Sequence, residues 1–386
     1  MLDQPDTHRF NFYWHIGFAA CTVAVVVIIL AVFMLRVWPD GLPSKGAESN
    51  AHAAAIPLAV LGDSNSQSYH DPVWFPMQNG ERGGAFRSRT FQWTEVLARL
   101  RGEEFDLGPW VQWGWPGPIA RGREWLGLAG GRSPPKQDYL YNFANSGAAC
   151  RNLMRGRFRQ APRLVALMNQ RPEHWQRGVV VIRIGHNDWS GLLDLQAHDP
   201  NAARLHETIA YCKGEIAAAM ALIRASHPST RILVVGVGNE ADDPSNLESY
   251  QTEAQTRNLR AAVANFNDAL RNLASGAPRI AYFDDFEWFE RLWGSRTNDG
   301  KPAFSAVEIG TTLRVTYSAG DDPRNALLKD LHPGLAWNTL WAQSLVQRLN
   351  QVFGLGVTPI SDEEVERFLA PLVESHKFER HEAITR

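Results

Sequence analysis

Short apolar runs alternate with longer amphipathic stretches from residue 56 onward. The runs are nearly continuous in Val, Ile and Leu, and we expect strands at 56–61, 139–143, 179–184, 231–237 and 279–283. Strands of this kind are typical of a parallel sheet that is buried on both faces. Helical patterns fall between or after them, at 91–101, 151–170, 202–226, 251–274 and 335–353. The alternation predicts an α/β fold, a flavodoxin-like three-layer α/β/α sandwich with a parallel sheet.

The longest apolar run lies before this region. Residues 16–35 contain no charged side chain, and a helix of that length measures about 30 Å, enough to cross a bilayer. Aromatic residues flank the run at 12–14 and at Trp38, as interfacial anchors do. A core helix or a cleaved signal peptide is the alternative, but the run lacks a polar stripe and a prompt cleavage site. We therefore expect one transmembrane helix, the anchor, within 16–38.

Composition sets the other boundaries. We expect an N-terminal tail at 1–15, a linker rich in Gly, Ser, Ala and Pro at 39–55, and the α/β domain at 56–356. Within that domain, 66–138 is rich in Gly, Pro and Trp and is expected to be an insertion near the site. A second stretch, 289–329, is expected to be irregular. A capping box begins the final segment, 357–386, which we expect to form a helix and tail.

The bulk properties exclude several classes of protein. The chain has 386 residues and a formal net charge of −2, so electrostatics gives no reason to expect a nucleic-acid partner. Cys21 falls in the apolar run, so at most Cys150 and Cys212 could pair, and two free thiols are the expectation. Histidines and acids are scattered rather than spaced as ligands, so we expect no metal.

Four short motifs carry candidate chemistry. Three of them directly follow expected strands: Gly62-Asp63-Ser64, Asn145-Ser146-Gly147 and Gly185-His186-Asn187-Asp188. The fourth, Asp330-Leu331-His332-Pro333, lies near the last expected helix. The carboxyl ends of parallel strands meet at one sheet edge, where open α/β folds bind their ligands.

In this order and between these elements, the four motifs resemble the SGNH (GDSL-type) serine hydrolase family over roughly 56–353. The resemblance implies the same three-layer fold and an esterase that needs no cofactor. It implies that Ser64 is the nucleophile and that His332 is the general base that takes its proton. Ser66 lies further from the strand end and does not match the family position.

The third member of the triad departs from the family pattern. The family usually carries its aspartate three positions before the histidine, which is Lys329 here, whereas Asp330 lies two before. Residues at i and i+2 of an extended segment point to the same face, so Asp330 can orient His332. Asp321 and Asp322, from the preceding loop, are the alternatives.

Gly147 and Asn187 are expected to complete an oxyanion hole with the backbone N–H of Ser64. A side chain at position 147 would obstruct close approach of the backbone amide to the substrate. Asn187 offers an amide N–H that does not titrate. An ordinary turn glycine and an Asx-turn asparagine are the alternatives.

The sequence thus predicts a single-pass, membrane-anchored serine hydrolase. The resemblance favours an extracytoplasmic catalytic domain, because anchored members commonly act on envelope material. The expected substrate is an ester, an O-acyl group such as acetyl on a carbohydrate, on the basis of the tether, the tryptophan-rich insertion and family analogy. The alternatives are a polysaccharide O-acyltransferase, a lysophospholipase or thioesterase, and a catalytically silent binding protein. The oligomeric state is left open.

Overall fold

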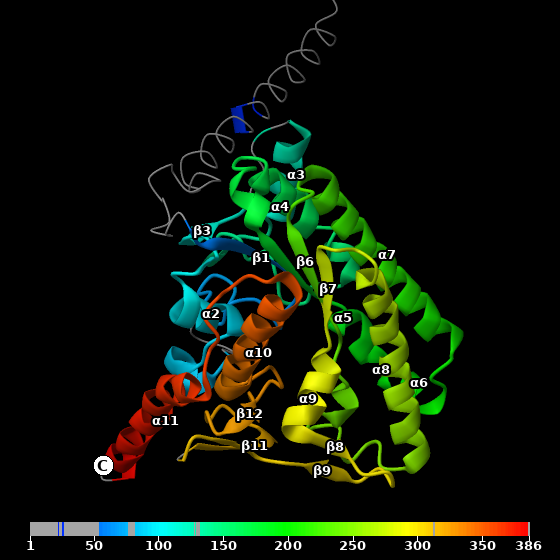
Figure 1. The fold of residues 1–386 in the computed structure, drawn as a ribbon, viewed down its shortest axis with the longest axis vertical. Coiled ribbons are helices and arrows are strands. Elements are labelled where there is room, and N and C mark those ends of the chain that lie inside the picture. The colour runs from blue at the N-terminus through cyan, green and yellow to red at the C-terminus, as the bar shows by residue number, and fades with distance from the viewer. Residues whose placement is uncertain are drawn as a thin grey trace, which may run out of the picture.

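A five-stranded parallel sheet forms the centre of the molecule (Figure 1). The structure is a computed structural model that describes residues 22, 25–26, 54–75, 82–126, 128, 132–311 and 313–384. Across the sheet the strands run in the order β2 (Phe105–Asp106), β1 (Ile56–Gly62), β5 (Val179–Arg183), β6 (Arg231–Val235) and β7 (Ile280–Phe283). The parallel sheet expected from the apolar runs is therefore present.

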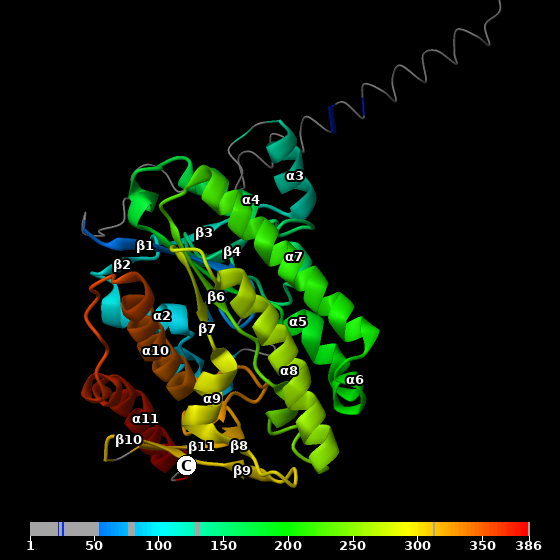
Figure 2. The same ribbon diagram turned by 45° about the vertical axis from the view of Figure 1, so that its right-hand side comes forward.

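Two hydrophobic cores lie on opposite faces of this sheet, because successive side chains of a strand point in opposite directions. Ala59 and Leu61 of β1 enter one core, and Leu58 and Val60 enter the other. The first face is covered by α4 (Gln160–Met168), α7 (Ala203–Ser226) and α8 (Glu253–Ala274), and the second by α2 (Trp93–Arg101) and α10 (Leu335–Phe353). Figure 2 shows the sheet between these two helix layers.

The expected strand at 139–143 is only partly a strand. Lys136–Tyr139 forms β4, which pairs antiparallel with β3 (Trp110–Trp113). A turn closed by Asn142 N–H and Tyr139 O (2.9 Å) then interrupts the chain. Beyond it, Phe143 N–H donates to Val60 O (2.8 Å), so this segment still lies beside β1.

The stretch at 289–329 is ordered, which corrects the expectation of irregular structure. It continues α9 (Asp285–Trp293) into a hairpin of β8 (Gly294–Arg296) and β9 (Pro302–Phe304). A three-stranded sheet of β10 (Val307–Ile309), β11 (Leu313–Ala319) and β12 (Asn325–Leu327) follows. In Figure 1 these strands lie beyond the carboxyl ends of the main sheet. Four of these strands, β8, β9, β10 and β12, are only three residues long, too short to show a pattern, whereas β11 alternates apolar and polar residues over seven positions.

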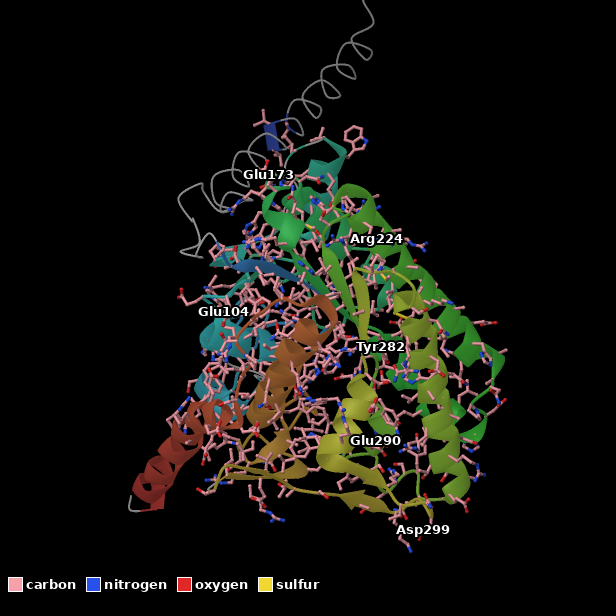
Figure 3. All side chains as sticks on the ribbon, in the orientation of Figure 1. Glu104, Glu173, Arg224, Tyr282, Glu290 and Asp299 are labelled. Carbon is pink, nitrogen blue, oxygen red and sulfur yellow. A yellow bond between two sulfur atoms is a disulfide. The ribbon has the colours of Figure 1, made fainter. Side chains whose placement is uncertain are left out.

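The remaining elements are short, except for the last helix. Side chains fill the space between the layers (Figure 3), where Arg224 marks α7 and Glu290 marks α9. Ser361 caps the last helix by accepting from Glu364 N–H (3.2 Å). The other helices are α3 (Gly117–Trp125), α5 (His186–Trp189), α6 (Leu193–His198) and α11 (Asp362–Ile384), with short 3-10 turns at Gly84–Arg89, Cys150–Asn152, His174–Arg177, Ser190–Leu192 and Glu240–Asp242.

The expected fold class included one transmembrane helix, and the structure contradicts that part of the expectation. No helix in the described part of the chain has the length and apolar character needed to cross a bilayer. Within 1–53, the region of the expected tail, anchor and most of the linker, only residues 22, 25 and 26 are described. The fold class is therefore an α/β sandwich with a parallel sheet, with no membrane helix assigned.

The expectation of two free thiols is wrong. Cys150 and Cys212 form a disulfide across 62 positions of sequence. Both side chains are fully buried where the turn at Cys150–Asn152 packs against α7. The bond therefore ties the chain that follows Gly147 to the helix layer.

Candidate active site

Ser64 lies in a tight turn at the carboxyl end of β1. The turn is closed by Asp63 O, which accepts from the N–H groups of Ser66 (3.1 Å) and Gln67 (3.2 Å). A Cβ at Gly62 would lie 2.5 Å from the backbone oxygen of Arg183, so the neighbouring strand requires glycine there. Ser64 is 5% exposed, and its hydroxyl has no hydrogen bond to any described residue. The turn thus holds Ser64 at the sheet edge, ready to be activated.

Ser66, the alternative nucleophile, is engaged elsewhere. It is fully buried, and its hydroxyl accepts a hydrogen bond from the indole N–H of Trp93 (3.2 Å). The position that the family motif indicates is therefore the better placed of the two serines.

Asp330 lies against His332, as expected for the acid of a triad. Its Oδ2 is 3.0 Å from Nδ1 of the imidazole, although the angle does not meet hydrogen-bond geometry. Its Oδ1 accepts from the backbone N–H of His332 (3.2 Å). The contact depends on Leu331, whose φ of 66° makes a turn, rather than on the extended segment that the spacing suggests.

The two alternative aspartates have other partners. Asp321 accepts from the backbone N–H of Lys329 (3.1 Å), and Asp322 accepts from that of Arg324 (2.9 Å). Neither makes a hydrogen bond or ion pair with His332 in the described part of the chain. Of the three candidate aspartates, Asp330 is therefore the one that contacts His332 among the described residues.

The surroundings of this pair keep the imidazole neutral and the carboxylate charged. Burial, followed by the charge of Arg82, lowers the pKa of His332 from its ordinary value. Burial alone would raise the pKa of Asp330, but the contact with His332 and the charge of Arg82 outweigh it and lower that pKa. A neutral imidazole beside a carboxylate is the resting state that a general base requires.

Arg82, which sequence reasoning missed, joins the nucleophile turn to the base. One terminal nitrogen, Nη1, donates to Ser64 O (3.3 Å), and the other, Nη2, lies 2.7 Å from His332 Nε2. Its Nε lies 3.3 Å from Asp330 Oδ2. A guanidinium has no acceptor, so Nε2 must hold a lone pair and the imidazole proton must sit on Nδ1, facing Asp330. This is the tautomer that can take a proton from a serine.

The expected oxyanion donors come from neighbouring loops. The backbone N–H groups of Ser64 and Gly147 have no hydrogen-bond partner among the described residues. Gly147 has a φ of 72°, and a Cβ there would meet nothing within 4 Å, so backbone conformation is what requires glycine. Asn187 is exposed and uses one hydrogen of its Nδ2 on Ala148 O (2.9 Å), which leaves the second available.

Hydrogen bonds hold these loops together. Asn145 N–H donates to Gly62 O (3.1 Å), and Ser146 N–H donates to the side-chain oxygen of Gln67 (2.6 Å). Cys150 N–H donates to a carboxylate oxygen of Asp188 (2.8 Å). All four sequence motifs thus meet at one edge of the sheet, while the catalytic roles of their residues stay a prediction.

A cavity of about 240 Å³ opens beside His332. Loops that follow β1, β5, β6 and β7 form one part of its wall, and β11 and α10 form another. None of the tryptophans of the expected insertion lines it, and Trp93, Trp113 and Trp115 are buried in the protein core. Trp337 of α10 provides the indole in the wall instead.

Comparison with known families agrees with this geometry. The family model described as GDSL-like lipase/acylhydrolase matches residues 58–300, more than half of the chain. The chain belongs to the GDSL-like lipase/acylhydrolase family. This GDSL-family protein is therefore an ester-hydrolysing enzyme, as the resemblance implied.

Solved structures that resemble this GDSL-family enzyme are distant. A lipase from a goat rumen metagenome is 14% identical with a TM-score of 0.38, over 80% of this chain and 100% of its own. A catalytic mutant of an acetylxylan esterase from Geobacillus stearothermophilus gives 12% and 0.36, over 77% and 94%. An extracellular lipase from Streptomyces rimosus gives 15% and 0.38, over 77% and 100%. At these values the likeness carries no argument about substrate. Among curated proteins, none matches the chain.

Proposed function

We propose that this enzyme hydrolyses O-acyl esters of carbohydrates, above all acetyl esters, with Ser64 as nucleophile, His332 as base and Asp330 as its orienting acid. One observation carries the proposal: a single guanidinium, that of Arg82, contacts both Ser64 and His332 while Asp330 lies against the imidazole. The nucleophile turn and the base therefore share one site, although they lie far apart in the sequence.

The reaction begins when Arg82 leaves Nε2 of His332, because the guanidinium occupies the lone pair that the base needs. Nε2 then takes the proton of the Ser64 hydroxyl as its oxygen attacks the acyl carbon. The backbone N–H groups of Ser64 and Gly147 and the amide of Asn187 stabilise the negative oxygen. The alcohol leaves with the proton from His332. Water then attacks the acyl-enzyme, His332 takes the water proton and returns it to Ser64, and the free acid departs.

The cavity supports a polar substrate group rather than a hydrocarbon chain. Its wall carries carboxyl and imidazole groups from Asp63, His186, Glu240 and Asp243. Burying a long hydrocarbon chain against such groups would strip them of water without replacing their hydrogen bonds. A lysophospholipase or thioesterase specificity is disfavoured on this ground.

We also propose that the catalytic domain works outside the cytoplasm. The support is the disulfide between Cys150 and Cys212, since such bonds form and persist in oxidising compartments.

Ester hydrolysis by paired serine variants tests the proposal. Purified enzyme is assayed on nitrophenyl esters of increasing chain length and for acetate release from an acetylated oligosaccharide. We expect preference for acetate, loss of activity by orders of magnitude in Ser64→Ala, and retention in the matched control Ser66→Ala, whose hydroxyl bonds to Trp93. An active Ser64→Ala enzyme, or a preference for long acyl chains, would overturn it.

A further inference from the structure

The cavity beside His332 contains polar groups that the proposed mechanism does not use. Asp63 is 1% exposed, and its Oδ1 accepts from Asn65 N–H (2.9 Å). Its Oδ2 has no hydrogen bond to a described residue, although Asp63 lines the cavity. A buried carboxyl oxygen without a partner costs free energy unless a ligand or water supplies one.

His186 and Glu240 form an ion pair in the same wall. Nδ1 of His186 lies 3.0 Å from Oε1 of Glu240, and Nε2 has no hydrogen-bond partner among the described residues. Burial opposes the charged imidazole, but the neighbouring carboxylate of Glu240 outweighs it and raises the pKa of His186 to about 9. Its free N–H therefore points to a ligand that accepts hydrogen bonds.

Asp243 supplies a neutral carboxyl group. Burial raises the pKa of this side chain to about 8, so at neutral pH it holds its proton and can both donate and accept a hydrogen bond. Elsewhere in the wall Arg183 is paired with Asp285 at 2.9 Å. The two ion pairs of the wall, His186 with Glu240 and Arg183 with Asp285, are each electrically balanced, so neither offers a free charge to an ammonium or phosphate group.

Aromatic side chains complete the wall on the side of β11 and α10. Tyr317 and Trp337 line the cavity, and the indole of Trp337 stacks on Phe289 with ring centroids 5.4 Å apart. The Tyr317 hydroxyl is held by donating to Asp242 O (3.0 Å), which fixes that ring. Rigid aromatic faces suit the C–H face of a ligand whose other edges carry hydroxyl groups.

We propose that this cavity, built from Asp63, His186, Glu240, Asp243, Tyr317 and Trp337, binds the sugar ring of the substrate, the alcohol from which the acyl group is removed. A sugar hydroxyl both donates and accepts, as the mixed polar wall requires, and the ring is uncharged. This inference rests on the proposed esterase function and adds the place where the alcohol binds.

Variants of Asp243 test the site through a comparison of two substrates. Asp243→Leu removes the donor and acceptor at similar size, Asp243→Asn keeps both, and Asp299→Leu is the matched control on the distant β8–β9 turn (Figure 3). We expect Asp243→Leu to lower kcat/KM for an acetylated methyl glycoside by about 10- to 100-fold. The loss that Asp243→Leu causes on nitrophenyl acetate, which has no sugar, should be at least about tenfold smaller, Asp299→Leu should keep both activities, and Asp243→Asn should recover most of the loss on the glycoside. Equal losses on both substrates, or none on the glycoside, would overturn the proposal.

A binding measurement separates this inference from the esterase proposal. In the Ser64→Ala background, NMR titration with the deacylated methyl glycoside reports occupancy of the cavity without any reaction. We expect binding that Asp243→Leu weakens and that Asp299→Leu leaves unchanged. Binding in an enzyme that hydrolyses no ester would support the sugar site and refute the esterase. Hydrolysis of the acetylated glycoside with binding indifferent to Asp243→Leu would refute the sugar site alone.

Discussion

Replacing Arg82 by methionine should move the acidic limb of the pH–rate profile upward. The guanidinium lies 2.7 Å from Nε2 of His332, is 4% exposed, and lowers the pKa of that imidazole. Its positive charge disfavours a second positive charge on His332, so the wild-type base stays neutral, and active, below its ordinary pKa of about 6.5. Without Arg82, the imidazole is protonated, and lost as a base, at a higher pH.

The magnitude follows from the distance. Two unit charges about 4 Å apart interact with about 4 kcal/mol at an effective dielectric constant of about 20, which corresponds to about 3 pKa units. Removing Arg82 also leaves Asp330 without that cation. The Asp330 carboxylate then stabilises the imidazolium of His332 more strongly, which raises the pKa of His332 further. Water that enters the vacated space screens part of this effect, so we expect an upward shift of about 1 to 3 pH units.

The assay is kcat/KM for nitrophenyl acetate between about pH 4 and pH 9, which reports the pKa of the free enzyme's base. Arg99→Met is the matched control, because Arg99 also lies over an aromatic ring, that of Phe91, but has no contact with His332. Its profile should coincide with that of the wild type. An Arg82→Met limb that stays in place or moves to lower pH would refute the electrostatic role assigned to Arg82.

Three further predictions concern the site and its support. Asn187→Ala should lower kcat by about 10²- to 10³-fold in steady-state kinetics, with KM and thermal stability unchanged, because it removes one oxyanion donor. Lys136→Met should lower the unfolding free energy, measured by urea denaturation, by about 3–5 kcal/mol. The reason is that the fully buried carboxylate of Asp138, 2.8 Å from Lys136 Nζ, loses its cationic partner. A loss below about 1 kcal/mol would contradict this prediction. Replacing both Cys150 and Cys212 by alanine should lower the unfolding free energy by about 2–5 kcal/mol, measured in the same way.

The sheet could be predicted because its strands are encoded locally. Val179–Arg183 and Arg231–Val235 each contain four consecutive apolar residues, and continuous runs of this kind form strands that are buried on both faces. The strand predicted at 139–143 is only partly correct because neighbouring segments determine how it pairs. Tyr139 packs edge-on against Trp110 of β3, and the chain turns directly after Tyr139. Four of the strands at 294–327 are three residues long, too short to predict, but β11 alternates apolar and polar residues over seven positions and could have been predicted.

The sequence predicts those residues of the site that belong to the four motifs. Ser64 and Asn187 follow β1 and β5, which are neighbours in the parallel sheet, so their closeness follows from topology, whereas His332 follows β12 of a separate sheet. Arg82 belongs to no motif, and only the folded chain brings it between the serine and the histidine. The role of Asp330 likewise depends on a left-handed residue that spacing alone does not reveal.

Covalent labelling of Ser64 by a fluorophosphonate, located by mass spectrometry of the digested protein, tests the central claim most directly. The label reacts only with a serine that a nearby base activates. We expect modification of the peptide that contains Ser64, with strong reduction in folded His332→Ala protein. Folded wild-type protein that stays unlabelled, or that carries the label on another residue, would contradict it.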